Sequence, residues 1–239
     1  MGKLYVVGMG PGSIEHMTLR AKQAIEESEV IVGYDKYIKL VEALIGSKEI
    51  FETGMRGEVQ RCKKALELSR SKVVSIISTG DAGIYGMAGL ILEIKEKSDV
   101  VEIVPGVTAA SAGAALLGAP LMHDSCYISL SDLMTPYDVI KKRVELATLG
   151  DFVISFYNPK STGRPHYLKE CIDLIRKYRQ GTTPVGVVRN ALRNNESVRV
   201  YTLDTLCEDE VDMFSVVIVG NSNTFIKGKN IITPRGYML

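Results

Sequence analysis

The chain has 239 residues, of which 46% are hydrophobic and 24% charged, a composition typical of a globular protein with a substantial core. This length allows one large domain or two of medium size. A formal net charge of +1, the absence of Trp and an aromatic content of 7% argue against a base-stacking nucleic-acid surface and against electrostatic attraction to an acidic membrane.

The cysteines and histidines exclude further classes of site. The four cysteines are widely spaced, so we expect reduced packing residues in a cytoplasmic protein. The sequence has only three histidines and no Cys-x-x-Cys motif, so we expect no protein-bound metal. The apolar run at the N-terminus is too short for a signal peptide, and the uncharged stretch 103–122 is interrupted by prolines and glycines, so we expect no membrane span.

Strand and helix patterns alternate through the first half of the chain. Short β-branched runs predict strands, and apolar residues at helical spacing predict helices between them. This alternation indicates a mostly parallel sheet with helices on both faces. The expected strands are 3–7, 30–32, 49–51, 73–77 and 100–104, and helices are expected from about residue 18, over 37–44 and 57–69, from residue 84 and over 108–117.

The segment 118–124 interrupts this alternation and predicts two domains, 1–118 and 119–239. Strand patterns without intervening helices near the end of the second half predict antiparallel pairs, and therefore a mixed sheet. The last segment, 220–239, is expected to be mostly irregular. The other expected strands are 125–130, 152–157, 185–188, 198–202 and 215–219, and the expected helices are 137–148 and 166–178. The fold class is therefore α/β, with two α/β domains.

The segment 78–89 follows a buried strand and leads into a helical pattern, which is where open α/β sheets bind ligands. Gly80 lets a ligand approach the backbone, and the first N–H groups of a helix near Ile84 could hold an anionic group. Asp81 could hold a cationic or hydroxyl-bearing group. A ligand with both signs of charge, such as an amino acid or S-adenosylmethionine, suits this loop. An ordinary turn with a helix-capping Asp is the alternative.

The glycines at positions 8, 10 and 12 follow the first strand and invite comparison with the dinucleotide-binding fingerprint. The match is poor, because Pro11 lies between the last two glycines and the helix begins later. A glycine-rich turn that faces a flat ligand fits better, with a plain tight turn as the alternative. The small residues of 105–115 favour either close approach of a flat ring or close packing of a helix on the sheet.

Arginines gather where the strand near residue 188 ends. Arg189, Arg193 and Arg199 could pair with the carboxylates of a polyanionic substrate, and a solvated hairpin is the alternative. No Ser/His/Asp, Cys/His or paired-carboxylate arrangement stands out, so no catalytic residue is assigned. This favours chemistry in which a reactive cosubstrate is positioned by the protein.

In their order and spacing, three segments resemble the motifs of the tetrapyrrole (corrin/porphyrin) methylase family, and the resemblance extends over the whole chain. These segments are 7–13, 80–85, and 104–111 followed by 118–121. Further segments, 156–161, 188–191 and 219–224 with 233–237, resemble the subgroup that methylates C17 of precorrin-3B or cobalt-precorrin-3. That resemblance implies a methyltransferase of cobalamin biosynthesis that also contracts the macrocycle.

The family resemblance implies S-adenosylmethionine bound in a cleft between the domains, a tetrapyrrole substrate that brings any cobalt with it, and usually a homodimer. The loop at Gly8 would face the tetrapyrrole. The ring contraction would need proton transfers, for which His123, Asp132 and Tyr157 are candidates that nothing in the sequence orients. The implied cofactor contacts are Pro11, Thr79, Gly80, Asp81, Ile84, Thr108, Ala109, Asn158 and Ala191, and the expected substrate contacts are Gly8, Gly10, Gly12, Arg189 and Arg193.

Other functions stay open at this point. Within the family, the nearest alternatives are methylation at C11 or C20 and methylation of uroporphyrinogen-III. Diphthine synthase shares the fold and acts on a protein. Outside enzymes, the alternative is a non-catalytic binder of nucleotide or tetrapyrrole, which would bind S-adenosylhomocysteine without turnover.

Overall fold

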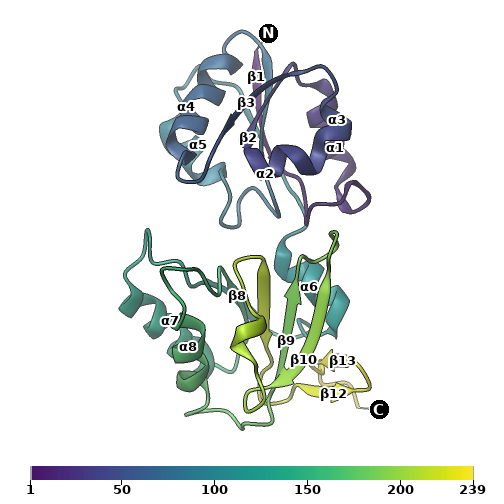
Figure 1. The fold of residues 1–239 in the computed structure, drawn as a ribbon, viewed down its shortest axis with the longest axis vertical. Coiled ribbons are helices and arrows are strands. Elements are labelled where there is room, and N and C mark those ends of the chain that lie inside the picture. Colours follow the sequence, from purple (N-terminus) through teal and green to yellow (C-terminus); the bar gives the residue numbers. More distant parts are fainter. Residues whose placement is uncertain (1, 239) are drawn as a thin grey trace. The chain divides into compact units, whose positions relative to one another are not determined.

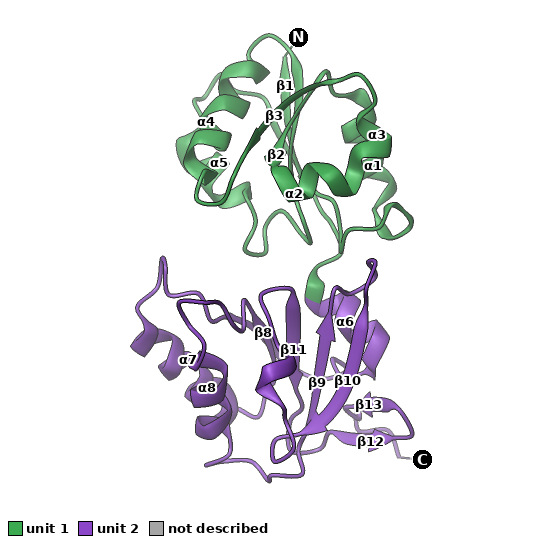
Figure 2. Ribbon diagram, viewed as in Figure 1, with its two compact units in different colours: residues 1–109 green, residues 110–239 purple. Residues whose placement is uncertain are grey.

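The computed structural model describes residues 2–238, and the chain divides into two compact units, Met1–Ala109 and Ala110–Leu239 (Figures 1 and 2). Each unit is built around a five-stranded sheet, so the expected two-domain α/β architecture is confirmed. The division falls earlier than the expected boundary after residue 118, because helix α6 (Ala109–Leu117) packs on the second sheet. A Cβ added at Gly113 of this helix would lie 2.7 Å from Val216 Cγ1.

The sheet of the first unit is parallel throughout, in the order β3-β2-β4-β1-β5. Its inner strands are nearly continuous apolar runs, because both of their faces are covered. Strands β1 and β4 pair from Lys3↔Val73 to Gly8↔Ser78, so they end at the same level. The strands are β1 (Lys3–Gly8), β2 (Val30–Tyr34), β3 (Glu49–Thr53), β4 (Val73–Ser78) and β5 (Val101–Val104).

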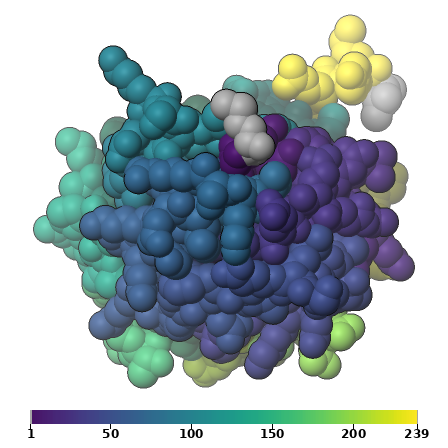
Figure 3. All heavy atoms as spheres, turned by 90° about the horizontal axis from the view of Figure 1, so that it is seen from above, coloured from purple at the N-terminus to yellow at the C-terminus, as the bar shows by residue number. Residues whose placement is uncertain are grey.

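Helices cover both faces of this sheet (Figure 1). One face carries α1 (Leu19–Glu27), which Thr18 caps by accepting a hydrogen bond from Ala21 N. The other face carries α4 (Glu58–Ser69) and α5 (Ala88–Ile94). Alternate strand residues enter two separate cores, with Val6 in one and Val7 in the other. Figure 3 shows the atoms closely packed at the end of this unit where β1 begins.

The expected continuous helix over 37–44 is wrong. The chain instead forms the short turns α2 (Asp35–Ile38), η2 (Lys39–Val41) and α3 (Glu42–Ile45). Val41 leaves helical backbone geometry, with φ −120° and ψ 16°, which separates the second turn from the third. Ile38, Val41 and Ile45 are all buried, so the broken path brings residues of three different turns into one core.

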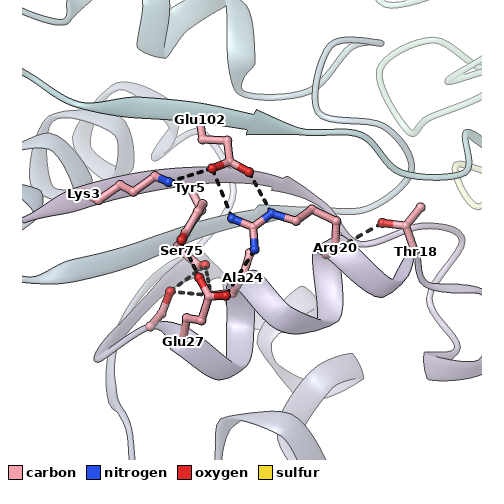
Figure 4. Close-up of polar contacts among 10 residues, drawn as sticks. Lys3, Tyr5, Thr18, Arg20, Ala24, Glu27, Ser75 and Glu102 are labelled. Atoms are coloured by element: carbon pink, nitrogen blue, oxygen red, sulfur yellow. Dashed lines mark hydrogen bonds and ion pairs between the residues drawn. The ribbon is translucent and has the colours of Figure 1, made fainter.

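A polar network fastens the edge strand β5 to β1 and α1 (Figure 4). Glu102 accepts hydrogen bonds from Lys3 Nζ at 2.7 Å and from Arg20 Nε at 2.8 Å. The Arg20 guanidinium also lies 4.9 Å from the centre of the Tyr5 ring. The network therefore holds the strand that leads directly into the segment 105–109.

The sheet of the second unit is mixed, in the order β10-β9-β11-β8-β7, and this expectation is confirmed. Only β7 and β8 run parallel, whereas β9, β10 and β11 pair antiparallel and have no α-helix between them, only the 3-10 turn η3 (Glu208–Glu210). Helices α7 (Tyr137–Leu149) and α8 (Tyr167–Ile175) cover one face, and α6 covers the other. The strands are β7 (Ser125–Ser129), β8 (Val153–Tyr157), β9 (Pro184–Arg189), β10 (Ser197–Thr202) and β11 (Ser215–Val219).

The tail over 220–238 is mostly irregular, as expected, but it contains a hairpin that was not expected. Strands β12 (Phe225–Lys227) and β13 (Asn230–Ile232) form a hairpin, and β13 pairs with β6 (Gly118–Ala119). The hydroxyls of Thr224 and Thr233 lie 2.8 Å apart in a buried position. The segment is ordered through a partner strand that lies far earlier in the chain, which local sequence patterns do not reveal.

Candidate functional site

Three loops of the first unit meet where β1, β4 and β5 end, and we call residues 8–13, 79–86 and 105–109 the three-loop site. The first two loops are bridged by the backbone: Gly10 N donates to Gly80 O at 3.0 Å, and Gly80 N donates to Gly10 O at 2.7 Å. The third loop is bonded to the residue that precedes α1, since Thr18 Oγ1 donates to Pro105 O at 3.1 Å. Open α/β sheets bind their ligands at such carboxyl ends of strands.

Two glycines of this site are required by the contact between the loops. A Cβ at Gly106 would lie 2.2 Å from Gly80 O and 2.3 Å from Gly8 O. A Cβ at Gly8 would lie 2.7 Å from Ala82 N. No side chain fits at either position without moving backbone, so the tight packing of loops explains both glycines. This geometry favours the plain tight turn, the alternative noted for Gly8, over exposure of that residue to a flat ligand.

Gly80 is different, because a Cβ at this position would clash with no atom. Its φ of +71° is in the left-handed region that favours glycine. A Cβ there would have only ordinary van der Waals neighbours, Thr108 Cα at 3.8 Å and Ala109 N at 3.9 Å. The backbone conformation explains the glycine at this position, and Gly80 N and O both bond to Gly10.

Asp81 joins the second and third loops. Its Oδ1 accepts a hydrogen bond from Gly83 N at 2.8 Å, and its Oδ2 accepts one from Gly106 N at 3.0 Å. An ionised carboxylate has about four lone-pair positions, so these two bonds leave room for a further donor from a ligand. The structure thus gives Asp81 an organising contact that its sequence motif did not predict.

The expected helix start near Ile84 is wrong, because α5 begins only at Ala88. Residues 84–86 form an irregular turn in which Tyr85 has a φ of +55°. The turn closes on itself, since Ala88 N donates to Ala82 O at 3.0 Å, and a Cβ at Gly86 would lie 2.5 Å from the same oxygen. Ile84 therefore lies beside the site without a helix N-terminus to hold an anionic group.

The remaining expected residues of the first unit also lie at this end of the sheet. Pro11 is buried, and Gly12 adopts a φ of +127°. Thr79 directly follows β4 and is half-buried, whereas Thr108 is buried immediately before α6. The first unit thus gathers all of its expected cofactor residues at the ends of β4 and β5 and in the loop after β1.

The second unit places its expected residues at one edge of its own sheet. Asn158 follows β8 with a φ of +51°, and its Nδ2 donates to Ser129 Oγ at 3.0 Å. Arg189 ends β9 opposite Ser215, the first residue of β11. Ala191 is buried in the loop after β9. In the same loop, Arg193 N donates to Asn190 O at 3.0 Å.

The candidates for proton transfer each have a structural partner. Asp132 accepts a hydrogen bond from Tyr167 Oη at 2.9 Å, which raises the pKa of Tyr167. Tyr157 Oη accepts one from Ala110 N at 3.0 Å, in the first turn of α6. His123 is exposed, and its Nδ1 accepts a hydrogen bond from Asp124 N at 2.9 Å. These contacts account for the positions of the three side chains, and none of them is assigned a catalytic role.

Sequence reasoning missed Asp212, whose Oδ2 accepts a hydrogen bond from Arg189 Nε at 2.7 Å. The two residues are 23 positions apart, and Asp212 stands in a loop without a motif. Only the antiparallel pairing of β9 with β11 brings them together. Asn158 likewise depends on a partner, Ser129, that no motif identified.

No helix within residues 2–238 is long and apolar enough to cross a membrane. In the same residues, no group of three or more His, Cys, Asp or Glu side chains is placed to hold a metal ion.

Comparison with known proteins agrees with this architecture. The chain is 51% identical over 240 residues to a probable cobalt-factor III C(17)-methyltransferase of Salmonella typhimurium, with 99% of this chain and 100% of that protein covered. It is 47% identical over 244 residues to a cobalt-factor III methyltransferase of Priestia megaterium, where 99% of this chain spans only 45% of that protein. The crystal structure of the methyltransferase CobJ matches with a TM-score of 0.92 at 33% identity, covering 98% of this chain and 100% of that chain. A family model, Tetrapyrrole (Corrin/Porphyrin) Methylases, matches residues 3–207, and this chain therefore belongs to the tetrapyrrole methylase family.

Proposed function

We propose that this chain transfers the methyl group of S-adenosylmethionine to C17 of cobalt-factor III, with contraction of the macrocycle, in cobalamin biosynthesis. The observation that carries this proposal is the end-to-end match, at 51% identity, to the Salmonella protein whose name states the activity. The Priestia protein, which is also named for cobalt-factor III, supports a substrate that already contains cobalt. Because this chain spans less than half of that longer protein, nothing of its remaining part is carried over.

We propose the three-loop site as the main binding site of the cosubstrate. Thr79 and Thr108 supply hydroxyl groups beside Gly80. Asp81 keeps acceptor capacity for the ammonium or a ribose hydroxyl of the ligand. These groups fit a ligand that carries an amino acid and a nucleoside, and its sulfonium supplies an electrophilic methyl group. Asn158 and Ala191 of the second unit are proposed as additional contacts.

The work of the chain in this reaction is to orient the reactants and to exclude water. A bond forms between the methyl carbon and C17 as the bond from the methyl carbon to sulfur breaks, and S-adenosylhomocysteine leaves. The hydrogen bond between Asp81 and Gly106 N fixes two loops of the site relative to each other. Arg189 and Arg193 are proposed to hold peripheral carboxylates of the tetrapyrrole.

Mass spectrometry tests the proposal. The purified chain is incubated with S-adenosylmethionine and cobalt-factor III. Parallel reactions contain metal-free precorrin-3B, the precorrin substrates of the C11 and C20 methyltransferases, or uroporphyrinogen-III in place of cobalt-factor III. We expect cobalt-factor III to gain the mass of one methyl group and to do so faster than the others. A gain on another tetrapyrrole alone would move the chain to a different member of the family.

We also propose that the chain acts as a homodimer in the cytoplasm, which the family resemblance and the type of reaction support. Light scattering of the purified chain at micromolar concentration measures the oligomeric state directly. A monomer mass that is unchanged by the tetrapyrrole would contradict the dimer.

A further inference from the structure

The guanidinium at the end of β9 is held by a carboxylate from the loop that precedes β11. Arg189 Nε and Asp212 Oδ2 are 2.7 Å apart, and their side chains are 38% and 39% exposed. A pair that is this short and partly shielded from solvent is a charge-assisted hydrogen bond with a defined direction. The Arg189 side chain therefore keeps one orientation while part of it stays accessible.

Asp212 is itself fixed by the turn in which it lies. Its Oδ1 accepts hydrogen bonds from Phe214 N at 2.8 Å and from Ser215 Oγ at 3.1 Å. The backbone continues this link, because Asn190 N donates to Phe214 O at 3.1 Å. The carboxylate and the end of β9 are thus parts of one hydrogen-bonded unit.

This arrangement leaves one edge of the guanidinium for a ligand. A guanidinium presents donors along the side that contains Nε and at the end formed by its two Nη groups. Asp212 bonds to Nε, and among the described residues 2–238 no hydrogen bond to the Nη groups of Arg189 is present. The end formed by the Nη groups has the spacing that a carboxylate binds with both oxygens.

The position of Arg189 within the sheet also suits binding. Val185 and Val187 pack into the core beneath α7 and α8. Side chains two residues apart share a face of a strand, so Arg189 lies on the same face of the sheet as these two valines. The loop that follows is tightly constrained, with Asn190 and Leu192 in the left-handed region. Binding residues held on such rigid supports lose little freedom when a ligand arrives.

We propose that Asp212 is a positioning residue that holds Arg189 with its two Nη groups presented to a carboxylate of the tetrapyrrole. This inference rests on the proposed function only in taking a tetrapyrrole with peripheral carboxylates as the ligand. Because Asp212 offsets part of the arginine charge, the site selects a carboxylate that fits the two Nη groups over anions attracted by charge alone.

A double-mutant cycle tests the inference with the variants Arg189→Met, Asp212→Asn and their combination. The Asn side chain retains an oxygen that can accept from Phe214 N, and melting temperatures identify any variant that fails to fold. We expect Arg189→Met to raise the KM for the tetrapyrrole about tenfold and Asp212→Asn to raise it roughly threefold, the range for a lost or misdirected charged hydrogen bond. The kcat and the Kd for S-adenosylhomocysteine should not change.

The combined variant carries the decisive result. If Asp212 acts through Arg189, the double variant has the KM of Arg189→Met alone. Arg189→Lys should not restore the wild-type KM, because an ammonium lacks the paired donors. Arg143→Met, which removes a charge at an exposed position of α7, is the matched control and should leave the KM unchanged.

Two results would overturn the inference: an unchanged KM in Arg189→Met, or effects of the two single changes that add in the double variant. Failure of the proposed function gives a different pattern. In that case the wild-type chain methylates another tetrapyrrole, and the same cycle measured on that substrate still decides the role of Asp212. A wild-type chain that neither binds nor methylates any tetrapyrrole would overturn both.

Discussion

Asp81 Oδ2 accepts a hydrogen bond from Gly106 N at 3.0 Å, so one carboxylate joins two loops that are 25 positions apart in the chain. The same side chain also bonds to Gly83 N within its own loop. A residue in this position affects ligand binding in two ways, by direct contact and by fixing the distance between the loops. The two contributions can be separated by choosing the replacement.

Replacing Asp81 should weaken cosubstrate binding in proportion to the hydrogen bonds that are lost. Asp81→Ala removes both backbone contacts, and we expect the affinity for S-adenosylhomocysteine to fall at least about tenfold and the free energy of unfolding to fall by ~1–2 kcal/mol. Asp81→Asn keeps one acceptor oxygen, so its affinity and its free energy of unfolding should lie between those of wild type and Asp81→Ala. Calorimetry and urea unfolding measure the two quantities. Unchanged affinity and turnover in Asp81→Ala would contradict the assignment of this loop.

Gly106→Ala should disrupt the three-loop site, because its Cβ would lie 2.2 Å from Gly80 O and the backbone would have to move. We expect a loss of ~2–3 kcal/mol in the free energy of unfolding, the size typical of overpacking, together with loss of S-adenosylhomocysteine binding. Gly89→Ala is the matched control, since a Cβ at this exposed helical position meets no atom within 4 Å. It should stabilise the chain by ~0.5–1 kcal/mol. Gly106→Ala with wild-type stability and affinity would show that the loops are not packed in this way.

Glu102 should give the first unit a pH-dependent stability. Hydrogen bonds from Arg20 and Lys3 lower the pKa of Glu102 to about 2, from 4.5. A carboxyl whose pKa is lower in the folded state stabilises the fold above its unfolded pKa and loses this contribution as the pH falls through the folded value. The stability difference between wild type and Glu102→Gln should therefore be present at neutral pH and shrink between pH 4.5 and about 2.

The size of this effect is limited, because the Glu102 side chain is 34% exposed and solvent screens the charges. We expect ~1 kcal/mol or less at neutral pH. Urea unfolding of both proteins at several pH values measures the difference. A difference that stays constant down to pH 2 would mean that the network with Lys3 and Arg20 does not act through ionised Glu102.

Thiol labelling should distinguish one cysteine from the others. Burial raises the pKa of Cys62 and Cys126 to about 11 and that of Cys171 to about 12, whereas Cys207 is exposed. Since the thiolate is the reactive form, a disulfide reagent at pH 8 should label a single thiol rapidly in the folded chain. All four should react after unfolding, and Cys207→Ser should remove the rapid phase. Rapid labelling of several thiols would indicate that the cores around the buried cysteines open readily.

The regular parts of the fold could be predicted from local patterns. The β-branched runs at 30–32 and 73–77 predicted central strands, since strands buried on both faces are apolar along their length. Features that depend on distant partners could not be predicted. The hairpin of β12 and β13 is ordered by pairing with β6, and α6 belongs to the second unit because Gly113 allows it to approach Val216 closely.

In the candidate site, too, residues that follow a predicted strand could be predicted, and contacts between distant segments could not. The order of the motifs identified Gly80, Asp81 and Thr108, because each follows a predicted strand of the parallel sheet. The sequence did not show that Gly106 is required by backbone contacts rather than by a ligand, since that depends on how three loops pack. Asp212 was missed because its importance arises only from the pairing of two antiparallel strands.

The central claim is that this chain methylates C17 of cobalt-factor III, and isotope labelling tests it most directly. The chain is incubated with cobalt-factor III and S-adenosylmethionine labelled with ¹³C in its methyl group, and the product is examined by mass spectrometry and carbon NMR. The account predicts one labelled methyl group, bonded to C17. A product without label, or with the label bonded to another ring carbon, would contradict it.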